Sequence, residues 1–213
     1  AVRETAEGAA LVTAGYQKLL RAGEMPNIIT TCCPSVNDLI EKYYPELVPL
    51  MAPVVSPMIA HGRLIRQIYG EDVKVVFLGP CIAKKAEAVG DERVSGAVDA
   101  ILTFEEVVQW WKMAGIHVSE CEDEALANPC PMVNQLYPVG GGIIHSVLAG
   151  PGAPREGQGR YYKVAVDGLN ACMELFEELK KGEIKNCFFE VNVCEGGCIK
   201  GPASDKWNRS AVR

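Results

Sequence analysis

The chain has 213 residues, with 21 Lys and Arg against 27 Asp and Glu, a formal net charge of −6 and a sequence pI of about 5.2. Its content of 48% hydrophobic and 23% charged residues is typical of a globular domain and excludes a largely disordered chain or a fibre. An acidic chain without a basic patch is not expected to bind nucleic acid or anionic membranes. No apolar run approaches the roughly 20 residues that span a bilayer, and no signal-peptide pattern is present, so we expect a cytoplasmic protein.

Helical and strand-like patterns alternate along the first part of the chain. Apolar residues at helical spacing predict an amphipathic helix over residues 4–23, and the β-branched run over 27–31 predicts a buried strand. A helix follows from Pro34 to Pro45. A second helix starts with Ser56 as N-cap and Pro57 in the first helical position, and it runs to about residue 69.

The alternation continues to the end of the chain and sets the fold class. The strand predicted over 72–78 ends at Gly79-Pro80-Cys81, and Thr103 with Glu106 forms a capping box that starts a helix. The remaining elements are a strand over 98–102, a helix over 104–114, an irregular stretch over 119–138, a helix over 143–148, a surface loop over 150–160, a strand over 162–166, a helix over 169–181 and a strand over 188–193. Repeated β-α-β-α order predicts an α/β fold with mostly parallel sheets.

Nine cysteines are the unusual feature of the composition. Three predicted strands end at cysteine-containing turns, and in open α/β sheets the carboxyl ends of the strands are where ligands collect. Neighbouring side chains of an extended segment point to opposite faces, so Cys32 and Cys33 are not expected to bind the same metal. One of that pair, together with Cys81, Cys194 and Cys198, gives four thiolates, the complement for a [4Fe-4S] cluster or a structural zinc.

Simpler explanations exist for some of these residues. Free cysteine is often a small buried hydrophobe. We assign that packing role, or a loop position, to four cysteines without a glycine or proline context: Cys121, Cys130, Cys172 and Cys187. His61 lies in the helix after Ser56-Pro57, where a core or surface role is favoured over a contact with a cluster. Zinc usually takes two short Cys-x₂₋₄-Cys knuckles, and this sequence has one.

Three motifs resemble, in order, the signatures of the [FeFe]-hydrogenase catalytic domain, the H-cluster domain: TTCCPSVNDLIEKYYPELVPLMAPVVSP, GPCIAKKAEA and EVNVCEGGCIKGP. VDAILTFEEV and VAVDGLNA resemble its connecting segments, so the similarity covers about residues 27–202. The resemblance implies two lobes of mostly parallel sheet flanked by helices, with the cluster site at the strand ends between the lobes. It makes 1–213 a partial H-cluster domain, with about 1–115 in the first lobe and about 116–213 in the second.

The same resemblance implies a cofactor and roles for individual residues. The cofactor is a [4Fe-4S] cubane linked to a diiron subcluster with CO, cyanide and dithiolate ligands. The implied cubane ligands are Cys33, Cys81, Cys194 and Cys198. Cys198 would bridge to the diiron unit, Cys32 would pass a proton to the dithiolate, and Lys84 would contact a cyanide. The residues implied to line the cofactor are Gly79, Pro80 and Met58.

Several positions depart from the family pattern. Val36, Gly79, Met58 and Ala52 stand where the family has tryptophan, methionine, glutamine and a serine of the proton route. The helix before the first motif lacks the acidic residues of that route and carries at those places Ala9, Ala10, Ala14 and Gly15. These changes resemble the divergent sensory members, which are slow catalysts attached to signalling domains. We also expect that the stretch upstream of the first motif, which completes the diiron pocket in the family, is absent from this sequence.

Three functions follow as hypotheses. The first is an [FeFe]-hydrogenase-type oxidoreductase of low activity that catalyses or senses 2H⁺ + 2e⁻ ⇌ H₂. Its expected partners are H₂ and protons, a ferredoxin or attached iron–sulfur domains as redox partner, and a signalling domain. The second is a [4Fe-4S]-only electron-transfer or sensory module without hydrogenase activity. The third is a structural zinc protein.

Overall fold

The structure is a computed structural model that describes residues 1–90, 92, 94–127, 132–149, 152–153 and 160–204. Its first half follows the helix signals of the sequence closely. The first elements are α1 (Ala6–Ala22), β1 (Ile28–Ile29), α2 (Pro34–Tyr43), the 3₁₀ turn η1 (Pro45–Leu50) and α3 (Pro57–Tyr69). Gly23 ends α1 in the left-handed conformation. Ser56 takes the predicted N-cap position of α3, but its buried hydroxyl has no hydrogen-bond partner, so it caps the helix by backbone conformation alone.

The middle of the chain builds a small βαβ unit. It contains β2 (Val76–Leu78), α4 (Ala83–Gly90), β3 (Ala100–Leu102) and α5 (Phe104–Met113). The predicted capping box at α5 is confirmed. Glu106 N donates to Thr103 Oγ1 at 3.3 Å, and Thr103 N donates back to Glu106 Oε2 at 2.8 Å. The strands are shorter than predicted because only their last residues pair with each other.

The C-terminal part supplies the longest strands. Its elements are the 3₁₀ turns η2 (Val118–Glu120) and η3 (Met132–Leu136), α6 (Gly142–Ala149), β4 (Tyr162–Asp167), α7 (Leu169–Lys180), β5 (Cys187–Asn192) and the 3₁₀ turn η4 (Cys198–Lys200). The last strand begins and ends one residue earlier than the sequence predicts. Most of the surface loop expected over 150–160 lies outside the described residues, as does Cys130.

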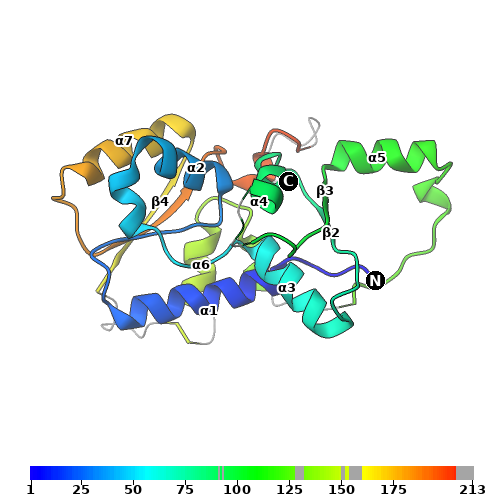
Figure 1. Ribbon diagram of the computed structural model, residues 1–213, viewed down its shortest axis with the longest axis horizontal. Coiled ribbons are helices and arrows are strands. Elements are labelled where there is room, and N and C mark those ends of the chain that lie inside the picture. Colours follow the sequence, from blue (N-terminus) through cyan, green and yellow to red (C-terminus); the bar gives the residue numbers. More distant parts are fainter. Residues whose placement is uncertain (91, 93, 128–131, 150–151, 154–159, 205–213) are drawn as a thin grey trace.

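Two parallel sheets confirm the predicted α/β class with parallel sheets and flanking helices. One has the order β1-β5-β4 and the other pairs β2 with β3, all in parallel (Figure 1). Strand β5 lies in the centre of the three-stranded sheet, and its Phe188 and Phe189 face Ile28 and Ile29 of β1. Its six residues are all buried, as expected of a strand covered on both faces.

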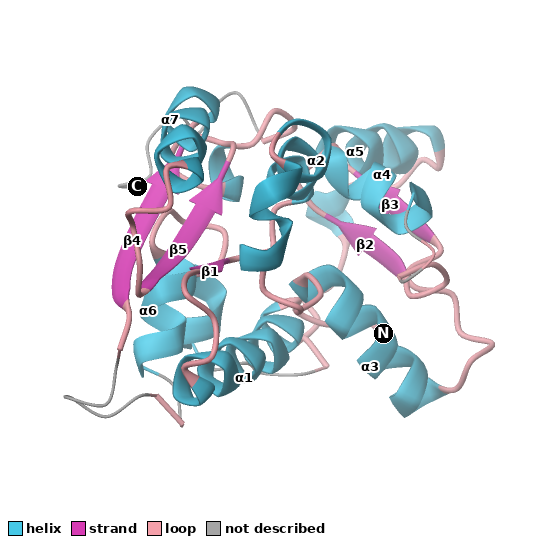
Figure 2. Cartoon of the chain, turned by 60° about the vertical axis from the view of Figure 1, so that its left-hand side comes forward, coloured by secondary structure: helices cyan, strands magenta, loops and turns pink. Residues whose placement is uncertain are grey.

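Helices cover both faces of the three-stranded sheet (Figure 2). Phe188 packs with α1 and α6 on one face, and Phe189 packs with α2 and α7 on the other. Since side chains alternate along a strand, β5 contributes successive residues to two separate cores. A third core lies under β2 and β3 and includes Met58 and Ile59 of α3.

The two sheets are built from interleaved parts of the chain. Strand β1, from the first 115 residues, pairs with β5 from the end of the chain, while β2 and β3 pair with each other. The predicted assignment of about 1–115 and about 116–213 to two lobes stays a prediction. Within the described residues, no helix is long and apolar enough to cross a membrane.

Candidate metal centre

The cysteine turns follow three parallel strands. Cys32 and Cys33 come after β1, Cys81 after β2, and Cys194 after β5. Two of these strands, β1 and β5, are direct neighbours, so their carboxyl ends meet at one edge of the sheet. The Cys81 turn leads into α4, and the ammonium of Lys84 in α4 donates to the backbone oxygen of Cys32 at 3.1 Å. This hydrogen bond connects the Cys81 turn to the same edge. The topology therefore gathers residues that are far apart in the sequence.

Cys32 and Cys33 point to opposite sides, which confirms the expectation from extended backbone. Cys32 packs against the core of α1 and α6, whereas Cys33 belongs to the core of α2 and α7. On its side Cys33 lies within electrostatic range of Cys194 and Cys198. Only Cys33 of the pair thus faces the other cysteine turns.

The Cys194 and Cys198 thiols have raised pKa values. The pKa of Cys198 is raised to about 12, first by burial and then by Cys33 and Cys81, with Lys84 opposing the shift. The pKa of Cys194 is raised to about 11 by burial, again with Cys33 and Cys81 adding to it. These two thiols need a cation nearby to become thiolates, and a coordinated thiol is deprotonated outright. Their chemistry therefore fits an iron–sulfur centre.

The turn between Cys194 and Cys198 fits closely against residues 138–140. Gly197 has φ +89°, and a Cβ there would lie 2.5 Å from Pro138 O and 2.6 Å from Gly140 N. Two hydrogen bonds join the segments, from Gly140 N to Gly196 O at 3.2 Å and from Ile199 N to Pro138 O at 2.9 Å. Glycine is required at 197 both for the left-handed backbone and for the close approach.

The second and third motifs meet at Pro80. Ala203 N donates to Pro80 O at 3.2 Å, and a Cβ on Gly201 would lie 3.1 Å from the same oxygen and 3.8 Å from Cys194 Sγ. The Gly201-Pro202-Ala203 segment therefore lies against the Cys81 and Cys194 turns. Gly79, next in the chain, donates its N–H to Leu102 O at 3.1 Å and lies against the Phe77 ring.

Lys84 is a buried cation beside the first cysteine turn. Its side chain is 9% exposed, and its ammonium pairs with Glu87 Oε2 at 2.6 Å in addition to the backbone oxygen of Cys32. Its burial sets Lys84 apart from a solvated lysine at the start of a surface helix. In the described part of the chain, two of its three N–H groups have these acceptors, which leaves one for a further acceptor.

Cys32 is surrounded by polar groups on the side away from Cys33. Tyr16 Oη of α1 lies 3.2 Å from its sulfur. Burial raises the pKa of the Cys32 thiol to about 12, while the Tyr16 hydroxyl and the Lys84 ammonium act in the opposite direction. At neutral pH Cys32 thus keeps its proton, which is the state a proton donor requires.

Glu190 is a wholly buried carboxylate in the central strand. It accepts from Gly141 N and Ile144 N, both at 2.8 Å, at the start of α6, and burial raises its pKa. A carboxylate at a helix N-terminus compensates for unpaired backbone N–H groups. Glu190 thereby fixes the 138–141 segment on which the Cys194 turn rests.

The other predicted residues have structural roles. Met58 is buried in the core under β2 and β3, and His61 is buried with its Nε2 at 3.1 Å from Glu7 Oε2. Cys172 and Cys187 are core residues, and Cys121 is exposed, as expected for the packing and loop cysteines. Met58 packs in the core under β2 and β3 with Val75 and Val98, and its place beside a cofactor stays a prediction.

Sequence reasoning missed two residues of the site. Tyr16 lies on the buried face of α1, and its hydroxyl could not be placed without the strand that follows. Glu190 had a usable signal, since a single carboxylate inside the apolar run FFEVNV needs a buried partner.

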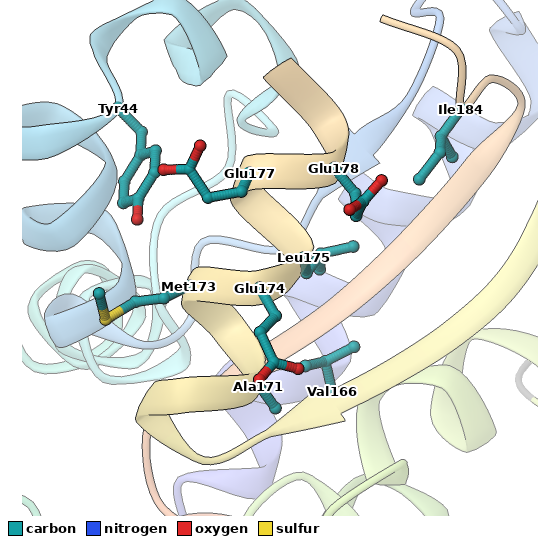
Figure 3. Close-up of a pocket in the computed structure, with 9 residues that line it drawn as sticks. All are labelled: Tyr44, Val166, Ala171, Met173, Glu174, Leu175, Glu177, Glu178 and Ile184. Carbon is teal, nitrogen blue, oxygen red and sulfur yellow. The ribbon is translucent and has the colours of Figure 1, made fainter. Parts of the chain in front are cut away.

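A surface depression elsewhere is unrelated to the cysteines. It lies along the outer side of α7 beside Tyr44 and β4, and no cysteine lines it (Figure 3). Its polar groups are mainly the α7 carboxylates Glu174, Glu177 and Glu178.

These features define a parallel α/β domain with cysteine turns after its strands. In the described part of the chain, no group of three or more His, Cys, Asp or Glu side chains is arranged to hold a metal ion, so the assignment of the four cysteines to one centre stays a prediction. A family model for the iron only hydrogenase large subunit, C-terminal domain, matches residues 1–202. The chain belongs to this family, whose members are iron–sulfur proteins.

Curated relatives fall into two groups. The chain is 28% identical over 87% of its length to the periplasmic [Fe] hydrogenase large subunit of Nitratidesulfovibrio vulgaris, covering 53% of that protein. It is 23% identical over 82% of its length to the cytosolic iron-sulfur assembly component 3 of Bos taurus, covering 46% of it. The chain thus spans about half the length of these relatives.

Solved structures share the fold. An [FeFe]-hydrogenase structure that concerns oxygen inactivation superposes with a TM-score of 0.73 at 20% identity, and it covers 100% of this chain and 71% of that one. An apo HydA1 variant from Chlamydomonas reinhardtii gives 0.72 at 20% identity, with the same coverage. At these identities the likeness establishes the fold and nothing finer.

Proposed function

We propose that the chain is an [FeFe]-hydrogenase-type domain that holds a [4Fe-4S] cubane linked to a diiron subcluster. The observation that carries the proposal is the order of three cysteine motifs at strand ends, supported by the hydrogen bond from the Lys84 ammonium to the backbone oxygen of Cys32. The proposed cubane ligands are Cys33, Cys81, Cys194 and Cys198. The bound group supplies the reversible conversion 2H⁺ + 2e⁻ ⇌ H₂, and the protein supplies anchors, protons and a dry pocket.

The residues of the chain have distinct tasks in this proposal. The buried Lys84 ammonium is held by Glu87 and the Cys32 backbone oxygen, so it presents its remaining N–H to an anionic ligand of the cofactor. Cys32 stays protonated because burial raises its pKa, and it holds a proton next to the site without serving as a ligand. Gly201 lets the segment after Cys198 approach Pro80 O closely, because a Cβ there would lie 3.1 Å from that oxygen.

A second candidate function is a [4Fe-4S]-only module. The observation that favours it is the similarity to assembly factors, including 31% identity over 98 residues to the cytosolic Fe-S cluster assembly factor NAR1 of Saccharomyces cerevisiae, a stretch that is 43% of this chain. The departures at Gly79, Met58 and Ala52 favour it as well, since they alter the surroundings expected for a diiron unit. A ferredoxin-like electron donor fits both candidates, and an attached signalling domain fits a sensory version of either.

The test is the stoichiometry of iron and acid-labile sulfide in protein produced anaerobically together with the maturation enzymes. Infrared bands of metal-bound CO and cyanide support the diiron site. Iron and sulfide in equal amounts without these bands support the cubane-only module, and zinc without sulfide contradicts both.

A matched pair of variants tests the ligand assignment. Cys33→Ala should abolish cluster binding, whereas Cys172→Ala removes a buried cysteine from the same core and should leave the iron content unchanged. Equal iron loss in both variants would contradict the assignment. Cys32→Ala should keep the cubane and abolish turnover.

A further inference from the structure

Tyr16 is the polar neighbour that α1 offers to Cys32. The tyrosine is fully buried, and its ring meets Phe188 edge-on with 5.5 Å between ring centroids and 76° between planes. Its hydroxyl lies 3.2 Å from Cys32 Sγ and 3.0 Å from Thr31 N. The hydroxyl is therefore held by a rigid ring against a single backbone turn.

The donors and acceptors around the Tyr16 hydroxyl determine which group donates in its bond to the Cys32 sulfur. Thr31 N–H can only donate, so it occupies one lone pair of the Tyr16 oxygen. The hydroxyl proton then needs an acceptor, because an unpaired buried donor costs about 1–3 kcal/mol. Among the described residues, the Cys32 sulfur is the acceptor within reach of this hydroxyl. Tyr16 thus donates and Cys32 accepts.

This direction leaves the thiol proton of Cys32 uncommitted. An S–H proton cannot lie on a bond in which the sulfur accepts, so it points away from Tyr16. In the described part of the chain the Cys32 sulfur has no second hydrogen-bond partner. The Lys84 ammonium nearby is a donor and cannot take the proton.

The carboxylate of α1 and the second buried tyrosine have partners other than the Cys32 sulfur. Glu7 is the acidic residue of α1, and it is engaged with Arg3 at 2.8 Å and with His61 at 3.1 Å. No carboxylate of α1 is therefore directed at Cys32. A second buried tyrosine, Tyr137, has its hydroxyl 2.8 Å from Thr13 Oγ1 and not at the sulfur.

We propose that Tyr16 is a positioning residue that donates its hydrogen bond to the Cys32 sulfur and so reserves the thiol proton for the bound cofactor. The inference rests on the proposed function for its consequence, but the hydrogen bond itself exists without any cofactor. Tyr16→Phe removes the donor and keeps the ring, and Tyr137→Phe is the matched control.

The first measurement is the infrared S–H stretching band of Cys32 in the full chain without iron, assigned by subtracting the spectrum of Cys32→Ala. The expected band is that of a thiol that does not donate, and it should change in Tyr16→Phe and stay unchanged in Tyr137→Phe. A band shifted strongly to low frequency in the unaltered chain, which relaxes upward in Tyr16→Phe, would mean that Cys32 donates to Tyr16 and would overturn the proposal. The spectra of the unaltered chain and of Cys32→Ala decide this point, even if Tyr16→Phe folds poorly.

The second measurement is H₂ turnover in matured protein. Tyr16→Phe should lower turnover roughly tenfold to a hundredfold through misorientation of Cys32, with the cubane EPR spectrum unchanged. Equal turnover in Tyr16→Phe and the unaltered chain would refute the role. Absence of CO and cyanide bands in the unaltered protein would refute the proposed function and leave the S–H test intact.

Discussion

Alanine at Gly197 should disrupt the cysteine turn more than its small size suggests. A non-glycine residue at φ +89° and ψ −179°, a region that essentially only glycine adopts, costs about 1–3 kcal/mol. The new Cβ would also lie 2.5 Å from Pro138 O and 2.6 Å from Gly140 N, which are backbone atoms that cannot rotate away. Moving them weakens the two hydrogen bonds between the segments, each contributing about 0.5–1.5 kcal/mol. We expect a total loss of about 2–6 kcal/mol in the free energy of unfolding.

Gly182 provides the matched control for this substitution. It has φ +74° after α7, and a Cβ there would meet nothing within 4 Å. Gly182→Ala should therefore cost only the backbone term of about 1–2 kcal/mol. Urea unfolding of both variants measures the difference, and iron content after maturation measures its effect on the site. Equal stability of the two variants, with full iron in Gly197→Ala, would refute the reasoning.

Three further substitutions test other parts of the structure. Burial raises the pKa of Glu190 above 4.5. Its contribution to stability is therefore full below that pH and falls as the pH rises through the pKa of the folded state. Glu190→Gln should remove this pH dependence from urea midpoints measured between about pH 4 and 7. Burial lowers the pKa of His61 below 6.5 despite the opposing effect of Glu7, and Arg3 adds to the lowering. Stability is therefore lost as the pH falls through the pKa of the folded state. In His61→Gln this loss of stability at acid pH should disappear from thermal unfolding curves. Thr103→Ala should cost about 1 kcal/mol in urea unfolding by removing the α5 cap, and a neutral result would contradict the capping box.

The sequence predicts the elements well where local chemistry decides them. Pro34, Pro57 and the Thr103 capping box place helix starts, and Gly23 places a helix end. The period-2 argument also separates Cys32 from Cys33 correctly. The turns η1 and η4 and the exact strand lengths were not predicted, because they depend on which neighbouring strand supplies a partner.

The candidate cysteines can be selected from the sequence, whereas the contacts that support them cannot. The order of three motifs points to these thiols, and their assignment to one centre stays a prediction. The bond from Tyr16 to Cys32 and the buried pair of Lys84 and Glu87 depend on how α1 and α4 pack against the first turn. Such contacts between distant segments leave no local pattern. The lobe boundary near residue 115, the cofactor composition and the partners stay predictions.

The central position of β5 has a consequence for assembly during synthesis. Because β5 inserts between β1 and β4, the sheet that orients Cys33 is complete only after the chain has been made to residue 192, and two of the four thiols lie beyond that point. The pairing of β1 with β5 closes a loop of most of the chain, and such distant contacts form slowly. A ribosome-bound chain therefore exposes its first cysteines long before the later ones are made, so loading of the proposed cluster must wait until Cys198 has been added.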